Sequence, residues 1–467
     1  MQATALTFIL VGLDAYPVRV EVDSGRGPAA FHLVGLAEAS VRESRVRVRA
    51  ALSQIGVALD EHVMTVNLAP ADLRKSSSGF DLAIAMGVLG ALRKVPAKAL
   101  SGIAFLGELS LTGAIRPVRG VLPALRGAAA QGVCRAIVPA LNGPEAAAVK
   151  GIEVFKTEHL ADVVTALGGG QSLALVGPRP ASAPIAPADY VDLADVRGQF
   201  AARRALEIAA SGGHNLLMMG PPGAGKTMLA RRLPTIMPPL DDEQALEITA
   251  LHSIAGLLQA ERGIVQIRPF RAPHHTVSPV GLVGGGDPIR PGEVSLAHHG
   301  CLFLDELLEF KRGALEVLRQ PLEDGVVTVV RGQRAARFPA RCMVVATTNP
   351  CPCGGGACRC NSAERERYLR KLSGPLLDRM DLCCAVQPPE GELAAVPVLS
   401  TARARDQVLQ ARRRQERRLA GARARCNAEL ADRELERHAA LEAAARRHLD
   451  ALCDQEGFSL RGRDRVR

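Results

Sequence analysis

Residues 216–233 read LLMMGPPGAGKTMLARRL, an apolar run followed by a glycine-rich turn and a helical pattern. The turn fits G-x-x-x-x-G-K-[ST] in the strand–loop–helix setting that this motif requires; the alternative is a plain glycine turn. In such a loop the amides and the helix N-terminus face phosphate oxygens, the lysine reaches the β/γ oxygens, and the hydroxyl ligates Mg²⁺. We therefore predict that ATP and Mg²⁺ bind at Gly220, Pro221, Pro222, Gly223, Ala224, Gly225, Lys226 and Thr227.

Two later apolar runs carry the remaining polar groups that such a site needs. The run 301–304 is followed by Asp305 and Glu306, and the run 343–346 is followed closely by Asn349. We expect Asp305 to hold Mg²⁺, Glu306 to orient the attacking water, and Asn349 to lie between the acids and the γ-phosphate. The alternatives are solvated acids at a strand end and an ordinary turn asparagine. Because strand, loop and helix recur, the sequence predicts an α/β fold with a parallel sheet.

Length and composition limit the class of protein. The 467 residues predict about three domains, and 47% hydrophobic with 23% charged residues is typical of a globular protein. The longest uncharged apolar stretches, 3–13 and 82–92, have about half the ~20 residues of a membrane span, and no Lys or Arg precedes the first. Eleven cysteines, an odd number, suit a reducing compartment, so we expect a cytoplasmic protein without a membrane segment.

Breaks in composition divide the chain into parts. Residues 1–170 alternate short β-branched runs with helical patterns and are predicted to form a small α/β domain. A linker is expected at 171–190, rich in Pro, Ala and Ser, followed by the nucleotide-binding domain at 191–392. Residues 393–467 are charged and Ala-rich and are predicted to be helical. The net charge is +10, and residues 401–467 hold 17 Arg against 11 acids, which permits a polyanionic partner.

Four cysteines crowd into ten residues as C-x-C-x4-C-x-C. Four thiolates suffice for a tetrahedral zinc ion, although C-x-C is tighter than the usual C-x2-C spacing. The alternatives are reduced thiols or a redox-sensitive loop. The candidate zinc ligands are Cys351, Cys353, Cys358 and Cys360.

The order of the motifs resembles that of AAA+ ATPases, including LLDR at 376–379. More specific are RPFRAPHHT at 268–276, PGEVSLAHH at 291–299 and NPCPCG at 349–354. Together these resemble the magnesium-chelatase-like family typified by ComM and YifB, over nearly the whole chain. The resemblance implies a helix-2-insert AAA+ module that forms a hexameric ring with ATP sites between subunits. It also implies that Arg379 is the arginine finger, Asn349 the sensor on the third strand, and Arg461 the second sensor.

The resemblance also leaves two classes of function open. One is an ATP-driven helicase or branch-migration motor on single-stranded or branched DNA, working beside recombination proteins or in natural transformation. The other is a chelatase-type or chaperone-like ATPase that remodels a protein client without DNA. A third, non-enzymatic alternative is a nucleotide-gated interaction module.

The N-terminal part helps to choose between these classes. TVNLAPAD at 65–72, GFDLAIA at 79–85 and GELSLTG at 107–113 resemble the Lon-protease-type domain of ComM and RadA, which chelatase subunits are expected to lack. No lysine lies between Lys98 and Lys150, where the partner of a Ser-Lys dyad belongs, so we expect no peptidase activity.

A hairpin is predicted over residues 325–339, just before the third strand. In the resembled clade this hairpin points into the pore of the ring, so Arg331, Arg334 and Arg337 are candidate contacts to DNA phosphates. A solvated hairpin tip is the alternative.

The family would continue beyond residue 467 through another helix, so the C-terminal helical lid is expected to be incomplete.

Overall fold

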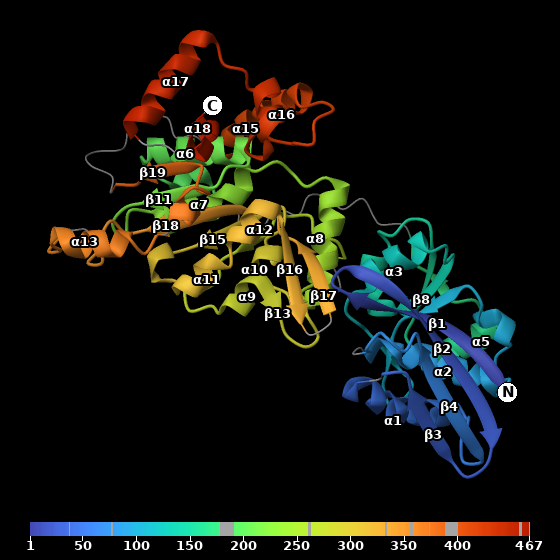
Figure 1. Ribbon diagram of the computed structural model, residues 1–467. Coiled ribbons are helices and arrows are strands. Elements are labelled where there is room, and N and C mark those ends of the chain that lie inside the picture. The colour runs from blue at the N-terminus through green and yellow to red at the C-terminus, as the bar shows by residue number, and fades with distance from the viewer. Residues whose placement is uncertain are drawn as a thin grey trace.

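The computed structural model has two large sheets, each built from its own part of the chain, and the C-terminal helices pack beside the second (Figure 1). Three two-stranded sheets are also present in the described residues. It describes the chain apart from residues 37, 76–77, 178–190, 260–262, 332–333, 355–357, 373, 388–399, 457–459 and 467. Among the helices so described, none has the length and apolar character that a membrane crossing needs.

The N-terminal sheet has eight strands. They are β1 (Gln2–Val11), β2 (Asp14–Arg26), β3 (Ala30–Val34), β4 (His62–Ala69), β5 (Ile103–Phe105), β8 (Arg135–Pro139), β9 (Glu153–Thr157) and β10 (Ala174–Leu175). Their order is β10-β9-β8-β5-β1-β2-β4-β3. β1 is antiparallel to β2 and parallel to β5, so the sheet is mixed. The edge strand β10 lies within the stretch 171–190 that the sequence assigns to a linker.

Helices cover both faces of this sheet. They are α1 (Ala39–Gln54), α2 (Asp81–Ala91), α3 (Val121–Ala130), α4 (Gly143–Ala146) and α5 (Leu160–Leu167), with a small hairpin of β6 (Glu108–Leu109) and β7 (Ile115–Arg116). Every residue of α2 is buried, because this helix lies between the sheet and α1. On the opposite face, α3 packs against β1, β5 and β8. The predicted small α/β unit therefore forms around two apolar layers.

The second sheet has five parallel strands, as the apolar runs predicted. They are β11 (Leu216–Met219), β12 (Phe270–Arg271), β15 (Cys301–Leu304), β18 (Met343–Thr348) and β19 (Leu382–Ala385), in the order β12-β15-β18-β11-β19. β15 and β18 are buried throughout, as expected of strands covered on both faces.

One face of the second sheet is covered by α6 (Phe200–Gly212) and α7 (Lys226–Ile236), and the other by α9 (Pro279–Val283), α10 (Glu293–Leu296), α11 (Arg312–Glu316) and α12 (Arg319–Asp324). The remaining elements of this part are α8 (Asp242–Ala255), β13 (Gly284–Gly285), β14 (Arg290–Pro291), β16 (Val326–Arg331), β17 (Arg334–Pro339), α13 (Ser362–Leu369) and α14 (Gly374–Leu377). α13 projects from the body (Figure 1).

The C-terminal segment is helical, as predicted. It forms α15 (Thr401–Arg418), α16 (Asp432–His438), α17 (Ala443–Glu456) and α18 (Leu460–Val466). α15 packs along α6 and α7. Arg412 donates to the carbonyl of Ala210 at 3.0 Å, and this bond ties α15 to the end of α6.

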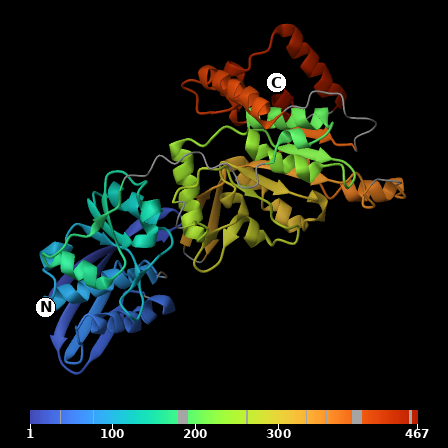
Figure 2. The same cartoon turned by 180° about the vertical axis from the view of Figure 1, so that it is seen from behind.

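The N-terminal unit touches the second one through α8 and the β16–β17 hairpin; Figure 2 shows α8 standing beside it. Val11 and Leu13, at the turn between β1 and β2, pack with Leu251 of α8 and with Phe338 of β17. Phe338 is fully buried. The hairpin is therefore held at its base by the N-terminal unit.

Candidate ATP site and its surroundings

The glycine-rich loop joins β11 to α7 at the carboxyl end of the parallel strands. A Cβ atom on Gly220 would lie 2.0 Å from the carbonyl oxygen of Val386, so only glycine fits there. Gly225 has a φ of +90° and turns the chain directly into the N-terminus of α7. The loop is thus shaped locally, which is why its sequence motif predicts it.

Lys226 is almost fully buried inside this loop. Its ammonium group donates to the carbonyls of Gly220 at 2.6 Å and Pro221 at 2.9 Å, and to Oδ1 of Asn349 at 3.1 Å. Burial lowers the pKa of Lys226, and the nearby Asp305 and Glu306 partly offset that effect. The contact brings the third strand's asparagine to the phosphate loop, as the sequence predicted.

Asp305 follows β15, which is separated from β11 by β18, and it reaches the phosphate loop at the carboxyl ends of the strands. Its carboxylate accepts a hydrogen bond from Thr227 Oγ1 at 3.0 Å and another from Thr347 Oγ1 at 2.5 Å. Hard carboxylate and hydroxyl oxygens at this spacing suit Mg²⁺. The two residues predicted to hold the metal therefore lie within hydrogen-bond distance of each other.

Glu306 is held by its backbone. It has a φ of +52°, in the left-handed region, and its N–H donates to Thr347 Oγ1 at 3.1 Å. Backbone strain of this kind is concentrated at functional sites. Thr347 thus positions both acids. The sequence does not predict this role, although Thr347 stands two residues before Asn349 at the end of the third strand.

Gln199 is a second missed residue. Its side-chain amide donates to the carbonyls of Ala224 at 3.0 Å and Gln387 at 2.5 Å, so it joins the phosphate loop to the end of β19. Its φ of +55° is uncommon for a residue with a side chain. No local motif in the sequence marks this role, because both partners are remote in the chain.

Arg379 lies between α14 and β19, at the amino end of the parallel strands. Its carbonyl accepts from the amide of Asn215, the residue before β11, at 2.8 Å, and its mostly buried guanidinium pairs with Glu323. Five residue steps of about 3.3 Å separate Asn215 from Gly220, or roughly 16 Å. Arg379 therefore lies at the amino end of the parallel strands, opposite to its own phosphate loop at their carboxyl end.

Arg461 lies in α18, and its side chain is outside the described part of the structure. The helix itself is anchored on the second unit: Arg465 pairs with Asp381 at 2.8 Å, beside β19. This contact draws the last helix toward the amino end of the sheet.

The predicted hairpin is present as β16 and β17, with Arg331 opposite Arg334 at its tip. Arg331 and Arg337 are exposed, while the side chain of Arg334 is outside the described part. Val327 and Phe338 pair near the base of the hairpin and are buried. Arg337 points to the opposite face from Phe338, and Arg331 lies at the tip, beyond the buried base, so both cations are open to an anionic partner.

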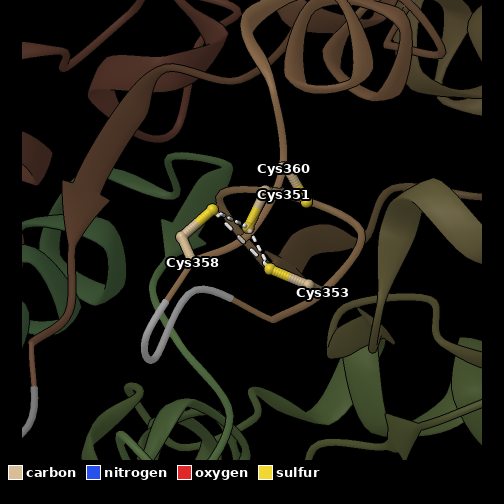
Figure 3. A group of neighbouring side chains, drawn as sticks. All are labelled: Cys351, Cys353, Cys358 and Cys360. Carbon is tan, nitrogen blue, oxygen red and sulfur yellow. Dashed lines mark hydrogen bonds between the residues drawn. The ribbon is translucent and has the colours of Figure 1, made fainter.

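The four cysteines predicted to bind zinc lie close together, although their C-x-C spacing in the sequence is unusual for zinc ligands (Figure 3). The Sγ of Cys351 lies 3.3 Å from that of Cys353 and 3.4 Å from that of Cys358. Cys360 completes the group, in which all four sulfurs lie within 4.8 Å of one another.

Histidines and arginines of the remaining motifs form an internal network. Oε2 of Glu247, in α8, lies 3.1 Å from Nε2 of His298 and 2.6 Å from Nε2 of His299. The N–H of Arg341 donates to His298 Nδ1 at 3.0 Å, so a neutral His298 carries its proton on Nε2 and donates it to Glu247. Arg268 reaches the carbonyls of Pro238 and His299, both at 2.5 Å. These residues tie α8 to the segment before β15.

Sequence matches cover almost the whole chain. Residues 192–393 match the family described as magnesium chelatase, subunit ChlI; residues 20–142 match subunit ChlI of Mg-chelatase; and residues 399–467 match the C-terminal part of that subunit. The chain is 41% identical to competence protein ComM of Haemophilus influenzae over 466 residues, and 40% identical to YifB of Escherichia coli over 462. Each alignment covers 98% of this chain and 90% of the relative. This chain belongs to the magnesium-chelatase-like ComM/YifB family.

Other relatives extend this picture. A protein of Mycobacterium tuberculosis is 44% identical over 467 residues, which cover 99% of this chain and 92% of that protein. Lon protease 2 of Thermus thermophilus is 29% identical over 198 residues (39% of this chain, 24% of that protein), and DNA repair protein RadA of Bacillus subtilis is 28% identical over 156 residues (33% of each). The similarity to Lon and RadA is therefore partial.

Membership of the ComM/YifB family implies an AAA+ module with ATPase activity. The match at residues 20–142 carries the name of the chelatase subunit, whereas the partial similarity to Lon and RadA agrees with the predicted resemblance, so the comparisons leave both classes of function open.

Proposed function

We propose that this chain is an ATP-hydrolysing motor that acts on DNA, as a helicase or branch-migration enzyme in recombination or natural transformation. The observation that carries the proposal is the connection between the arginine-bearing hairpin and the ATP site. β17 ends at Pro339 and β18 begins at Met343, so the hairpin continues almost directly into the strand that leads to Asn349. The similarity to a competence protein and, in part, to a DNA repair protein favours DNA as the substrate.

The chemistry follows from the groups around the phosphate loop. Lys226 and the loop amides would neutralise phosphate charge, while Thr227 and Asp305 would hold Mg²⁺, which supplies further charge neutralisation when bound. Glu306 would orient the attacking water, and Asn349 would contact the γ-phosphate. Loss of the γ-phosphate would release the Asn349 side chain and so change the strand that follows the hairpin.

Arg379 would act on the nucleotide of a neighbouring subunit, because it lies at the opposite end of the strands from its own phosphate loop. This arrangement supports a homo-hexameric ring with ATP sites between subunits. Arg461 is assigned to the second sensor on the resemblance alone. The proposed layout is a Lon-type, non-proteolytic domain at 1–170, a linker at 171–190, an AAA+ core at 191–392 and a helical lid at 393–467. We place the protein in the cytoplasm, with recombination proteins as further partners.

The test is the steady-state ATPase rate without DNA, and with single strands, duplex and a four-way junction, using Glu306→Gln as the blank. Glu306→Gln should retain ATP binding and lose turnover, since only the water-orienting carboxylate is removed. Stimulation that is largest on the junction supports branch migration. Equal rates under all conditions, well above the blank, would refute a DNA-dependent motor.

The second candidate is a chelatase-type or chaperone-like ATPase that remodels a protein client. The matches to the magnesium chelatase subunit along most of the chain favour it. It predicts turnover that is indifferent to DNA, so the same experiment separates the two.

Replacing both Arg331 and Arg337 by Ala should reduce the salt dependence of DNA binding only if the hairpin contacts phosphates.

A further inference from the structure

We propose that Cys351, Cys353, Cys358 and Cys360 bind one Zn²⁺ ion that fixes the loop between β18 and α13 against the phosphate loop. The proposal stands on the geometry of the cysteines and does not depend on whether the motor acts on DNA. Cys351 is buried, Cys353 is exposed, and Cys358 and Cys360 are half-buried, so the site lies at the surface with one ligand anchored in the fold.

The spacing of the sulfurs suits a single tetrahedral ion. Three of the distances between them are 3.3, 3.4 and 3.6 Å. A disulfide would need about 2.05 Å, whereas four sulfurs at about 2.3 Å from zinc lie roughly 3.8 Å apart. The sulfurs of Cys351, Cys353 and Cys358 therefore need only a small expansion to enclose one ion, and that of Cys360 lies within 4.8 Å of them. A cluster of several irons is too large for this space, because its irons and sulfides would separate the cysteines further.

The surroundings support a metal-bound state. The N–H of Gly354 donates to the carbonyl of Cys351 at 3.1 Å, which closes a tight turn through the first two cysteines. Arg365, in the first turns of α13, donates to the Sγ of Cys358 at 3.2 Å. A cation that hydrogen-bonds a thiolate ligand offsets the excess negative charge of four thiolates around a divalent ion.

The loop also touches the ATP site at two points. Gly354 has a φ of +88°, and a Cβ atom there would lie 2.9 Å from Cγ of Pro222 in the phosphate loop. Asn349, which accepts from Lys226, is two residues before the first cysteine. Residues 350–361 form neither helix nor strand where the structure describes them, so a crosslink through the metal would supply the order that hydrogen bonds do not.

The first experiment measures bound metal in the purified 467-residue chain by mass spectrometry. We expect about one zinc per chain. Cys353→Ser with Cys358→Ser should lose it, whereas the matched pair Cys134→Ser with Cys383→Ser, two exposed cysteines outside the cluster, should keep it. Zinc retained by the first pair, or iron in place of zinc in the unmodified chain, would overturn the proposal.

Two further measurements guard against a variant that simply misfolds. Zinc-stripped wild-type chain should take up one Co²⁺ and develop the absorption of tetrahedral cobalt thiolate; a spectrum of octahedral cobalt overturns the assignment. Arg365→Ala removes no ligand and should weaken zinc binding about tenfold or more, as measured against a chromophoric chelator. Unchanged affinity would refute the role of Arg365 and with it the charge argument.

The link to the ATP site has its own readout. Removal of zinc should weaken the binding of a fluorescent ATP analogue, because the loop would no longer support Pro222 and Asn349. Zinc-loaded and zinc-stripped chains with equal nucleotide affinity would overturn this link. The metal content and the ATPase test are independent, so failure of the DNA-motor proposal would leave the zinc result intact.

Discussion

The side chain of Thr347 joins the two acids of the site. Its hydroxyl donates to Asp305 and accepts from the N–H of Glu306. Thr347→Val keeps the shape but removes both hydrogen bonds, so we expect turnover to fall about tenfold or more while ATP binding remains. Steady-state ATPase rates and the binding of a fluorescent ATP analogue measure the two effects. Thr347→Ser retains the hydroxyl and should stay near wild type; a valine variant at the wild-type rate would contradict this role.

At the scale of elements, the seam between the N-terminal unit and α8 contains a buried acid. Ser253 of α8 donates to Glu145 Oε2 at 2.6 Å and accepts from the N–H of Gly120 at 3.0 Å, while Asn142 donates to Glu145 Oε1 at 2.6 Å. Burial raises the pKa of Glu145 above its ordinary value of 4.5, in spite of these donors. The folded chain therefore binds this proton more tightly than the unfolded chain does.

The sign of the pH dependence follows from this difference. Between pH 4.5 and the higher pKa of the folded chain, the folded state holds more protons, so the contribution of Glu145 to stability falls as pH rises. Glu145→Gln is neutral at every pH. We expect its melting temperature relative to wild type to increase from pH 4.5 to pH 7, as measured by thermal unfolding. A constant difference would mean that Glu145 titrates normally.

Across the whole molecule, Arg379 and the phosphate loop lie at opposite ends of the strands of one sheet. If each ATP site is completed by a neighbour, Lys226→Ala and Arg379→Ala chains should each be inactive alone. A one-to-one mixture should regain about a quarter of the wild-type ATPase rate, because some sites then combine an intact loop with an intact arginine. Arg370→Ala, which removes an exposed arginine paired with Glu366, is the matched control. A mixture that stays inactive despite assembling would refute the shared site.

Much of the ATP site was predictable because its motifs act through local geometry. The glycines of 220–225 shape the loop by themselves, and apolar runs of β-forming residues predict β11, β15 and β18 with little help from neighbours. Since the carboxyl ends of parallel strands lie on the same side of a sheet, predicting these strands also predicts that Lys226, Asp305 and Asn349 converge. The crowding of four cysteines into ten residues likewise brought their sulfurs within reach of one another.

The amino-acid sequence by itself thus determined the strands, the phosphate loop and the kinds of groups that surround it, because these depend on near neighbours along the chain. Only the tertiary structure decided that Thr347 holds both acids, that Gln199 links the loop to β19, and that Arg379 lies at the end of the strands opposite to its own phosphate loop. It also decided that α8 meets the N-terminal unit at Glu145. These contacts join residues that are remote in sequence, and their pairing follows from sheet order and packing, which no local pattern encodes.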